Sequence, residues 1–278
     1  MDIIIPLFLG VIQGLTEFLP VSSSGHLVLL QKLTGIQEPA ILFDICVHVG
    51  TLLAVLLIFY EDIKDIVISM IQFPGQFYKE KKHAGFNMIW HNKHLKTALL
   101  IIVGTIPTGL MGIFLRKQVN ILFGNISIVG CMLIITGIFL WITHFIKNTE
   151  RTIDQITLWE AIFLGIIQGF AIIPGISRSG ATITAALLLK MDRQLAGKFS
   201  FLLSIPSIMG ALVLELSHPA GTPVFSYPII ITASLISFAV GFFALKLLLS
   251  VVNQGRLYYF SPYCIGVGGL ALSSIFFS

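Results

Sequence analysis

Six long apolar runs limit what this chain can fold into. They cover residues 41–60, 98–115, 121–146, 199–216, 227–250 and 259–277, and each is close to the roughly 20 residues that a helix needs to span a bilayer. Charged residues make up 11% of the 278 residues, whereas soluble domains carry about 25%. The sequence therefore predicts an all-α polytopic membrane protein with about six transmembrane helices, as one integral membrane domain over residues 1–278.

Two further apolar segments are interrupted by polar residues, prolines and glycines, and they form an internal repeat. Residues 10–25 align without a gap on residues 165–180, and Gly10, Gln13 and Ser22 meet identical residues at 165, 168 and 177. Such broken segments at matching positions indicate re-entrant hairpins whose tips meet near the membrane midplane. We predict two repeats, at about residues 1–146 and 156–278.

The basic residues predict the topology. If the first hairpin opens to the outer face, residues 61–96, 147–157, 190–198 and 250–258 lie inside, and 61–96 forms a cytoplasmic loop. Thirteen basic residues then lie in or close to the inner segments and three lie outside, which fits the positive-inside rule. The inner residues are Lys64, Lys79, Lys81, Lys82, Lys93, Lys96, Lys147, Arg151, Lys190, Arg193, Lys198, Lys246 and Arg256, and the outer ones are Lys32, Arg116 and Lys117. This topology makes the second hairpin enter from the cytoplasmic side, so we expect the repeats to be inverted.

The two hairpin tips carry groups that suit an anion. Serines at residues 22–24 follow Pro20 and would begin a half-helix, and Ser177 and Ser179 repeat this arrangement around Arg178. Free N–H groups at helix starts bind anions, and a guanidinium binds phosphate with two parallel hydrogen bonds. The tips therefore predict a site for phosphate or pyrophosphate.

Glu17 and His26 flank the first tip, and the residues alone leave their roles open. An intramembrane carboxylate is a functional-site hypothesis by default, and Glu17 would hold a divalent cation, act as a general base, or both. Gln13 lies one turn earlier on the same helical face. His26 would be an acid, a base or a nucleophile, and Ser22, Ser23 and Ser177 are further candidates for nucleophile or phosphate donor. In the alternative interpretation Glu17 and Arg178 only form a buried ion pair, and His26 is a hydrogen-bonded core histidine.

Asp44 and His48 lie one helical turn apart at the start of an apolar run. They would either support the site from a neighbouring helix or form a simple pair at the membrane interface.

With these residues identified, a family resemblance follows. Residues 10–26 (GVIQGLTEFLPVSSSGH) and 174–182 (PGISRSGAT) closely resemble the two signature motifs of the bacterial undecaprenyl-diphosphate phosphatases, also called bacitracin-resistance proteins. Residues 44–50 and 199–206 also resemble blocks of that family. The resemblance implies hydrolysis of undecaprenyl diphosphate at the outer face of the cytoplasmic membrane, with a divalent cation, Mg²⁺ or Ca²⁺. Such an activity recycles the cell-wall carrier lipid and gives bacitracin resistance.

The same resemblance implies roles for individual residues. Glu17, His26 and Arg178 match the main catalytic residues, with Glu17 also as the metal ligand, and we expect Ser23 to be catalytic with them. We expect substrate binding from Gln13, Ser22, Ser24, Ser177, Ser179 and Thr182. Position 13 is Gln where many members have Glu, so a single carboxylate would have to suffice here.

The repeat architecture also fits a function other than hydrolysis. Inverted repeats with broken helices are also the architecture of transporters, so a transporter of undecaprenyl phosphate or another anion is the alternative. An acid-phosphatase-like lipid phosphatase is disfavoured, because its basic first motif and late His–Asp pair have no counterparts at suitable places. The expected partners are a polyprenyl diphosphate lipid and membrane lipids, and the sequence leaves open a homodimer. The net charge is +4, but no basic stripe is interleaved with aromatics, so we expect no nucleic-acid partner.

Overall fold

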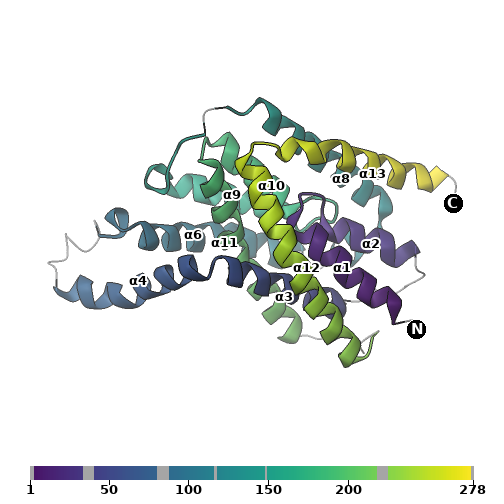
Figure 1. The fold of residues 1–278 in the computed structure, drawn as a ribbon, viewed down its shortest axis with the longest axis horizontal. Coiled ribbons are helices and arrows are strands. Elements are labelled where there is room, and N and C mark those ends of the chain that lie inside the picture. Colours follow the sequence, from purple (N-terminus) through teal and green to yellow (C-terminus); the bar gives the residue numbers. More distant parts are fainter. Residues whose placement is uncertain are drawn as a thin grey trace.

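The computed structural model describes residues 3–33, 41–79, 88–115, 118–147, 149–217 and 225–276 (Figure 1). Within these ranges the chain is helical and contains no strand beyond one isolated bridge between Arg151 and Met191. The all-α class is therefore as predicted. The main helices are α1 (Ile4–Phe18), α2 (Ser23–Leu33), α3 (Ile41–Ile58), α4 (Tyr60–Lys79), α6 (Lys93–Leu115), α7 (Val119–Gly124), α8 (Ile126–Ile142), α9 (Leu158–Phe170), α10 (Arg178–Leu188), α11 (Arg193–Ser217), α12 (Tyr227–Asn253) and α13 (Ser261–Ser273).

Among the described residues, four segments are long and apolar enough to cross a membrane, and they lie in α6, α8 with its 3₁₀ extension, α11 and α12. A fifth span results if α3 and α4, which are bent by 77° at their junction, count as one broken helix. The sixth predicted run, 259–277, is helical over 257–276, but 3₁₀ turns at both ends leave only 13 residues of α-helix in α13. The prediction of several membrane-spanning helices is therefore confirmed. The described residues contain four or five candidate spans where about six were predicted, because the last predicted run forms only a short α-helix.

The segment predicted as a cytoplasmic loop, residues 61–96, is largely helical where it is described. α4 carries Glu61 and Asp62 in its first turn, where the helix dipole favours negatively charged carboxylates. Apolar residues then recur at helical spacing at Ile63, Ile66 and Met70, and Lys198 of α11 forms an ion pair with Asp62. Its helical periodicity and this tether explain the helix. The sidedness of the segment stays a prediction.

The internal repeat reappears in the packing of the helices. α1 packs on α12, and α9 packs on α6 (Figure 1). A Cβ on Gly14 would lie 2.8 Å from the carbonyl oxygen of Ser237, and the matching Gly169 lies directly against Met111. The repeated glycines thus allow close approach to a neighbouring backbone or side chain. Each hairpin packs on a helix from the other half, so the two halves form one body.

Both hairpins have short arms, as predicted for broken segments. α1 and α2 have 15 and 11 residues, and α9 and α10 have 13 and 11, so no arm reaches the length of a span. The second tip is fixed to α8 by Thr136, whose hydroxyl donates to the carbonyl of Gly175 at 2.8 Å and accepts from the N–H of Ser177 at 3.1 Å. Thr136 lies near the middle of the apolar segment Ile126–Phe145, so the second tip packs against the centre of this candidate span.

The start of α9 is anchored by a capping box and an ion pair. Thr157 caps the helix, and its N–H donates to Glu160 at 2.8 Å. Arg151 donates to both carboxylate oxygens of Glu160, at 2.6 and 3.1 Å. This bidentate pair fixes the end of the hairpin arm away from the tip.

Candidate active site

The two hairpin tips are in direct contact. A Cβ on Gly25 would lie 3.2 Å from the Cα of Gly175. Ser22 joins the tips, because its hydroxyl oxygen accepts from the N–H of Gly25 at 3.3 Å and from the N–H of Gly175 at 3.1 Å. Ser22 has a φ of 68°, a left-handed conformation that non-glycine residues rarely adopt. The chain therefore uses a strained turn to bring the two half-sites together.

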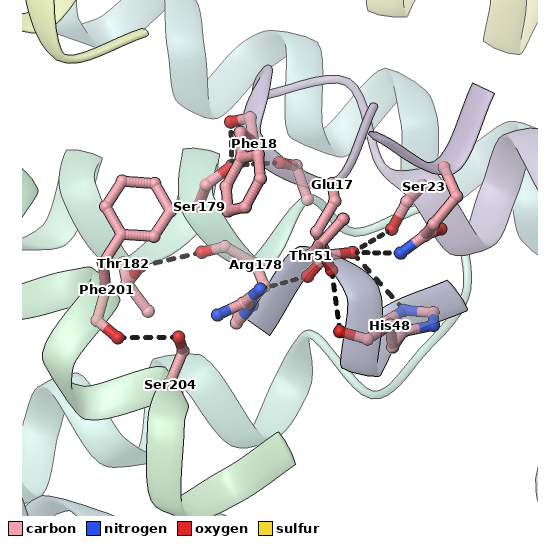
Figure 2. Close-up of polar contacts among 12 residues, drawn as sticks. Glu17, Phe18, Ser23, His48, Thr51, Arg178, Ser179, Thr182, Phe201 and Ser204 are labelled. Carbon is pink, nitrogen blue, oxygen red and sulfur yellow. Dashed lines mark hydrogen bonds and ion pairs between the residues drawn. The ribbon is translucent and has the colours of Figure 1, made fainter. Parts of the chain in front are cut away.

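Glu17 is the centre of the polar cluster at this junction, and it is 7% exposed. One carboxylate oxygen accepts from Arg178. The other accepts from Ser23 at 2.7 Å and from Gln13 at 3.0 Å, and it lies 3.3 Å from Nε2 of His48. Figure 2 shows Ser23, His48 and Arg178 converging on Glu17 from α2, α3 and α10. A buried carboxylate needs such donors, because burial without them costs several kcal/mol.

Arg178 comes from the first turn of α10, where Ser177 caps the helix by accepting from the N–H of Gly180 at 3.1 Å. Its side chain is 16% exposed. Among the described residues its guanidinium hydrogen-bonds to Glu17 alone. Since a guanidinium carries five N–H donors, the others can bind an anion. The predicted meeting of Arg178 with the first tip is present in the structure.

His48 is the residue whose role the sequence left open, and it belongs to this cluster. Its Nδ1 lies 2.7 Å from the carbonyl oxygen of Asp44, which can only accept, so Nδ1 carries a proton. Its Nε2 faces the carboxylate of Glu17, which also accepts. The ring of His48 therefore lies between two acceptors, the carbonyl of Asp44 and the carboxylate of Glu17. Glu17 in turn lies between Arg178 and His48.

His26, predicted as catalytic, points elsewhere. Its Nδ1 lies 2.8 Å from the carbonyl oxygen of Ser22, and its Nε2 lies 2.7 Å from the hydroxyl of Tyr263 on α13, whose ring stacks on it. Nδ1 therefore donates to the Ser22 carbonyl, and in the neutral ring Nε2 accepts from Tyr263. This geometry makes His26 a support of the strained turn at Ser22.

The predicted substrate-binding hydroxyls form hydrogen bonds within the tips. Ser179 donates to the carbonyl of Phe18 at 2.9 Å, and Thr182 donates to the carbonyl of Arg178 at 2.8 Å. Ser24 lies 3.4 Å from the hydroxyl of Ser22 and is only partly buried. Ser22 joins the tips and Ser177 caps α10, as described above. Of these residues, Ser24 is the most accessible to a ligand, and the others shape the site.

Gln13 carries a buried oxygen without a partner. The residue is fully buried, its amide N–H donates to Glu17, and its Oε1 has no hydrogen bond in the described part of the structure. No group of three or more His, Cys, Asp or Glu side chains suited to a metal occurs among the described residues. Mg²⁺ is commonly held by one or two protein oxygens together with substrate phosphates. The carboxylate of Glu17 and the free oxygen of Gln13 fit that mode of binding.

A guanidinium and a carboxylate that meet between the starts of two half-helices define a class of protein. It is a polytopic membrane protein with a buried centre of charged and polar groups where two short-armed helical hairpins meet. The chain belongs to the family described as bacitracin resistance protein BacA, whose model matches residues 6–270.

Curated relatives are similar in sequence over nearly the whole chain. A protein of Desulfatibacillum aliphaticivorans named undecaprenyl-diphosphatase is 46% identical over 269 residues, which cover 96% of this chain and 97% of that protein. A protein of Halothermothrix orenii with the same name is 40% identical over 280 residues, covering 99% and 100% of the two chains. One from Methanobrevibacter smithii, again with that name, is 37% identical over 269 residues and covers 96% of each.

Proposed function

We propose that this protein hydrolyses undecaprenyl diphosphate to undecaprenyl phosphate and inorganic phosphate. Family membership and the name shared by the relatives support this activity. The observation that carries the proposal to this chain is the contact of Arg178 and Ser23 with the two oxygens of Glu17. Purified protein in detergent should release phosphate from the lipid diphosphate, and Arg178→Ala should bind and cleave it poorly. Near wild-type turnover of Arg178→Ala would refute the proposed site.

Arg178 and the two helix starts would bind the diphosphate. The guanidinium lies beside the first turns of α2 and α10, whose N–H groups and dipoles favour negative charge. In a site with little water, such preorganised donors stabilise the charge that develops at the transferred phosphoryl group. Arg178 would turn from Glu17 toward the phosphate oxygens when the substrate enters.

Ser23 is the best-placed nucleophile. Its hydroxyl donates to Glu17 at 2.7 Å, which is the distance expected between a nucleophile and its general base. The Ser23 oxygen would bond to the terminal phosphorus while its proton passes to Glu17. The bond from phosphorus to the bridging oxygen would break, and undecaprenyl phosphate would leave with the electron pair. Water would then hydrolyse the phosphoserine and release phosphate.

His26 would position Ser23 rather than attack phosphorus, because both its ring nitrogens have partners at Ser22 and Tyr263. Single-turnover quenching with radiolabelled substrate distinguishes the routes. Label should be trapped on Ser23. Label on His26, or no trapped label with direct transfer from water, would contradict this assignment.

A divalent cation, Mg²⁺ or Ca²⁺, is part of the proposal. The carboxylate of Glu17 and Oε1 of Gln13 would hold it, with phosphate oxygens completing its coordination. It would supply charge neutralisation at the diphosphate. Chelation should abolish turnover, and re-addition of the cation should restore it.

We place the active site on the outer face of the cytoplasmic membrane, with the prenyl tail between spanning helices. The support is the positive-inside rule, because this orientation puts most of the basic residues on the cytoplasmic side. Labelling of single cysteines from either side of intact cells tests this orientation. Membrane lipids would surround the spans, and light scattering of the purified protein would decide between a monomer and a homodimer.

A transporter is the competing function. The relatives carry the name of a hydrolase, which favours the enzyme. Phosphate release in detergent, where no transport registers, distinguishes the two.

A further inference from the structure

His48 contacts the proposed catalytic carboxylate from a helix outside both signature motifs. It lies on α3, and its side chain is 30% exposed, whereas the side chain of Glu17 is 5% exposed. The ring is held by its Nδ1–H bond to the backbone carbonyl of Asp44. This anchor points Nε2 at the same oxygen of Glu17 that accepts from Ser23.

We propose that His48 is a positioning residue, which holds Glu17 in place when Arg178 turns to the substrate. Glu17 has four polar partners, which are Arg178, His48, Ser23 and Gln13. Anion binding by Arg178 weakens the first of these contacts. A carboxylate this deeply buried then depends on the donors that remain, and His48 is the one of them that lies outside both hairpins.

His48 would therefore act mainly on substrate affinity. With His48 present, Arg178 can exchange Glu17 for phosphate while the carboxylate keeps a hydrogen-bond donor on α3. Without it, each binding event would leave the carboxylate of Glu17 two donors short. The affinity for a diphosphate should fall by about tenfold or more, in the range of one hydrogen bond to a charged group.

The test compares two substitutions at one position with a matched control. His48→Leu removes the donor, and His48→Gln keeps an N–H that reaches about as far from the backbone as Nε2. His144→Leu makes the same chemical change at an exposed histidine in the 3₁₀ turn Thr143–Phe145, whose ring packs on Trp141 and Tyr258. For each purified protein we would measure kcat and KM with undecaprenyl diphosphate, and the Kd of inorganic pyrophosphate by calorimetry.

We expect His48→Leu to raise both KM and the pyrophosphate Kd about tenfold or more. His48→Gln should stay within about threefold of wild type, and His144→Leu should match it. A His48→Leu protein with unchanged KM and Kd would overturn the assignment, even if its kcat fell, since partial unfolding lowers kcat alone. Equal impairment of His48→Gln and His48→Leu would overturn it as well.

This inference rests on the proposed function, and the two can fail separately. If wild type binds pyrophosphate but releases no phosphate from the lipid, the proposed function fails while the calorimetry still tests His48. If wild type neither binds pyrophosphate nor turns over, both fail.

Discussion

Replacement of Glu17 by Gln perturbs the centre of the site with little change in shape. The amide keeps one oxygen acceptor and removes the negative charge. It leaves the guanidinium of Arg178 without its counter-ion, and it leaves Ser23 without a base.

The magnitudes follow from these contacts. Removal of one partner from a buried ion pair typically costs about 3–5 kcal/mol of stability. A general base contributes about 10²–10⁴ in rate, which corresponds to roughly 3–5 kcal/mol of activation free energy. Glu17→Gln should therefore lower both the melting temperature and the rate of phosphate release.

The assay is phosphate release at saturating lipid, together with thermal unfolding in the same detergent. Glu61→Gln is the matched control, because the side chain of Glu61 is 74% exposed in an i,i+3 pair with Lys64, where ion pairs contribute little. We expect wild-type behaviour from the control and a rate lower by about 10²–10⁴ from Glu17→Gln. Turnover of Glu17→Gln within threefold of wild type would refute the role of this carboxylate.

Three further predictions test the scaffold. Ser22→Ala leaves two N–H groups at the tip junction without an acceptor. The free energy of unfolding, measured by denaturation in detergent, should therefore fall by about 2 kcal/mol or more. Gly10→Ala would place a Cβ 2.6 Å from a backbone carbonyl of α12 and should destabilise the fold by about 1–3 kcal/mol, whereas Gly109→Ala, with nothing within 4 Å, should not. Burial opposes ionisation of Glu160 at the start of α9, but the hydrogen bonds from Arg151 and the helix cap prevail and lower the pKa of Glu160. Its stabilising contribution is therefore present above the usual pKa of Glu and is lost as the pH falls through the lowered value, so Arg151→Ala should flatten the acid limb of melting temperature against pH.

Much of the site could be predicted from the sequence because the repeat carries it. The matched glycines, prolines and serines indicated two hairpin tips, and the arginine in the second motif complemented the carboxylate in the first. The structure places Arg178 on Glu17 across 161 positions of sequence. A duplication allows such a long-range contact to be predicted, since symmetry relates its two halves.

Contacts that break the symmetry could not be predicted. His48 occupies a third helix, and its only sequence signal was a polar pair one turn apart in an apolar run. His26 lies in the first motif, but its partner Tyr263 lies on α13, and nothing in the local sequence links them. The bend between α3 and α4 was missed because the charged segment after the apolar run resembles a loop when its helical periodicity is not considered.

Phosphate release by the purified wild-type protein in detergent tests the central claim most directly. The protein should liberate one inorganic phosphate from each undecaprenyl diphosphate and leave undecaprenyl phosphate, and Ser23→Ala should reduce this rate by about 10²-fold or more. Lipid flipping in liposomes without any phosphate release in detergent would contradict the account.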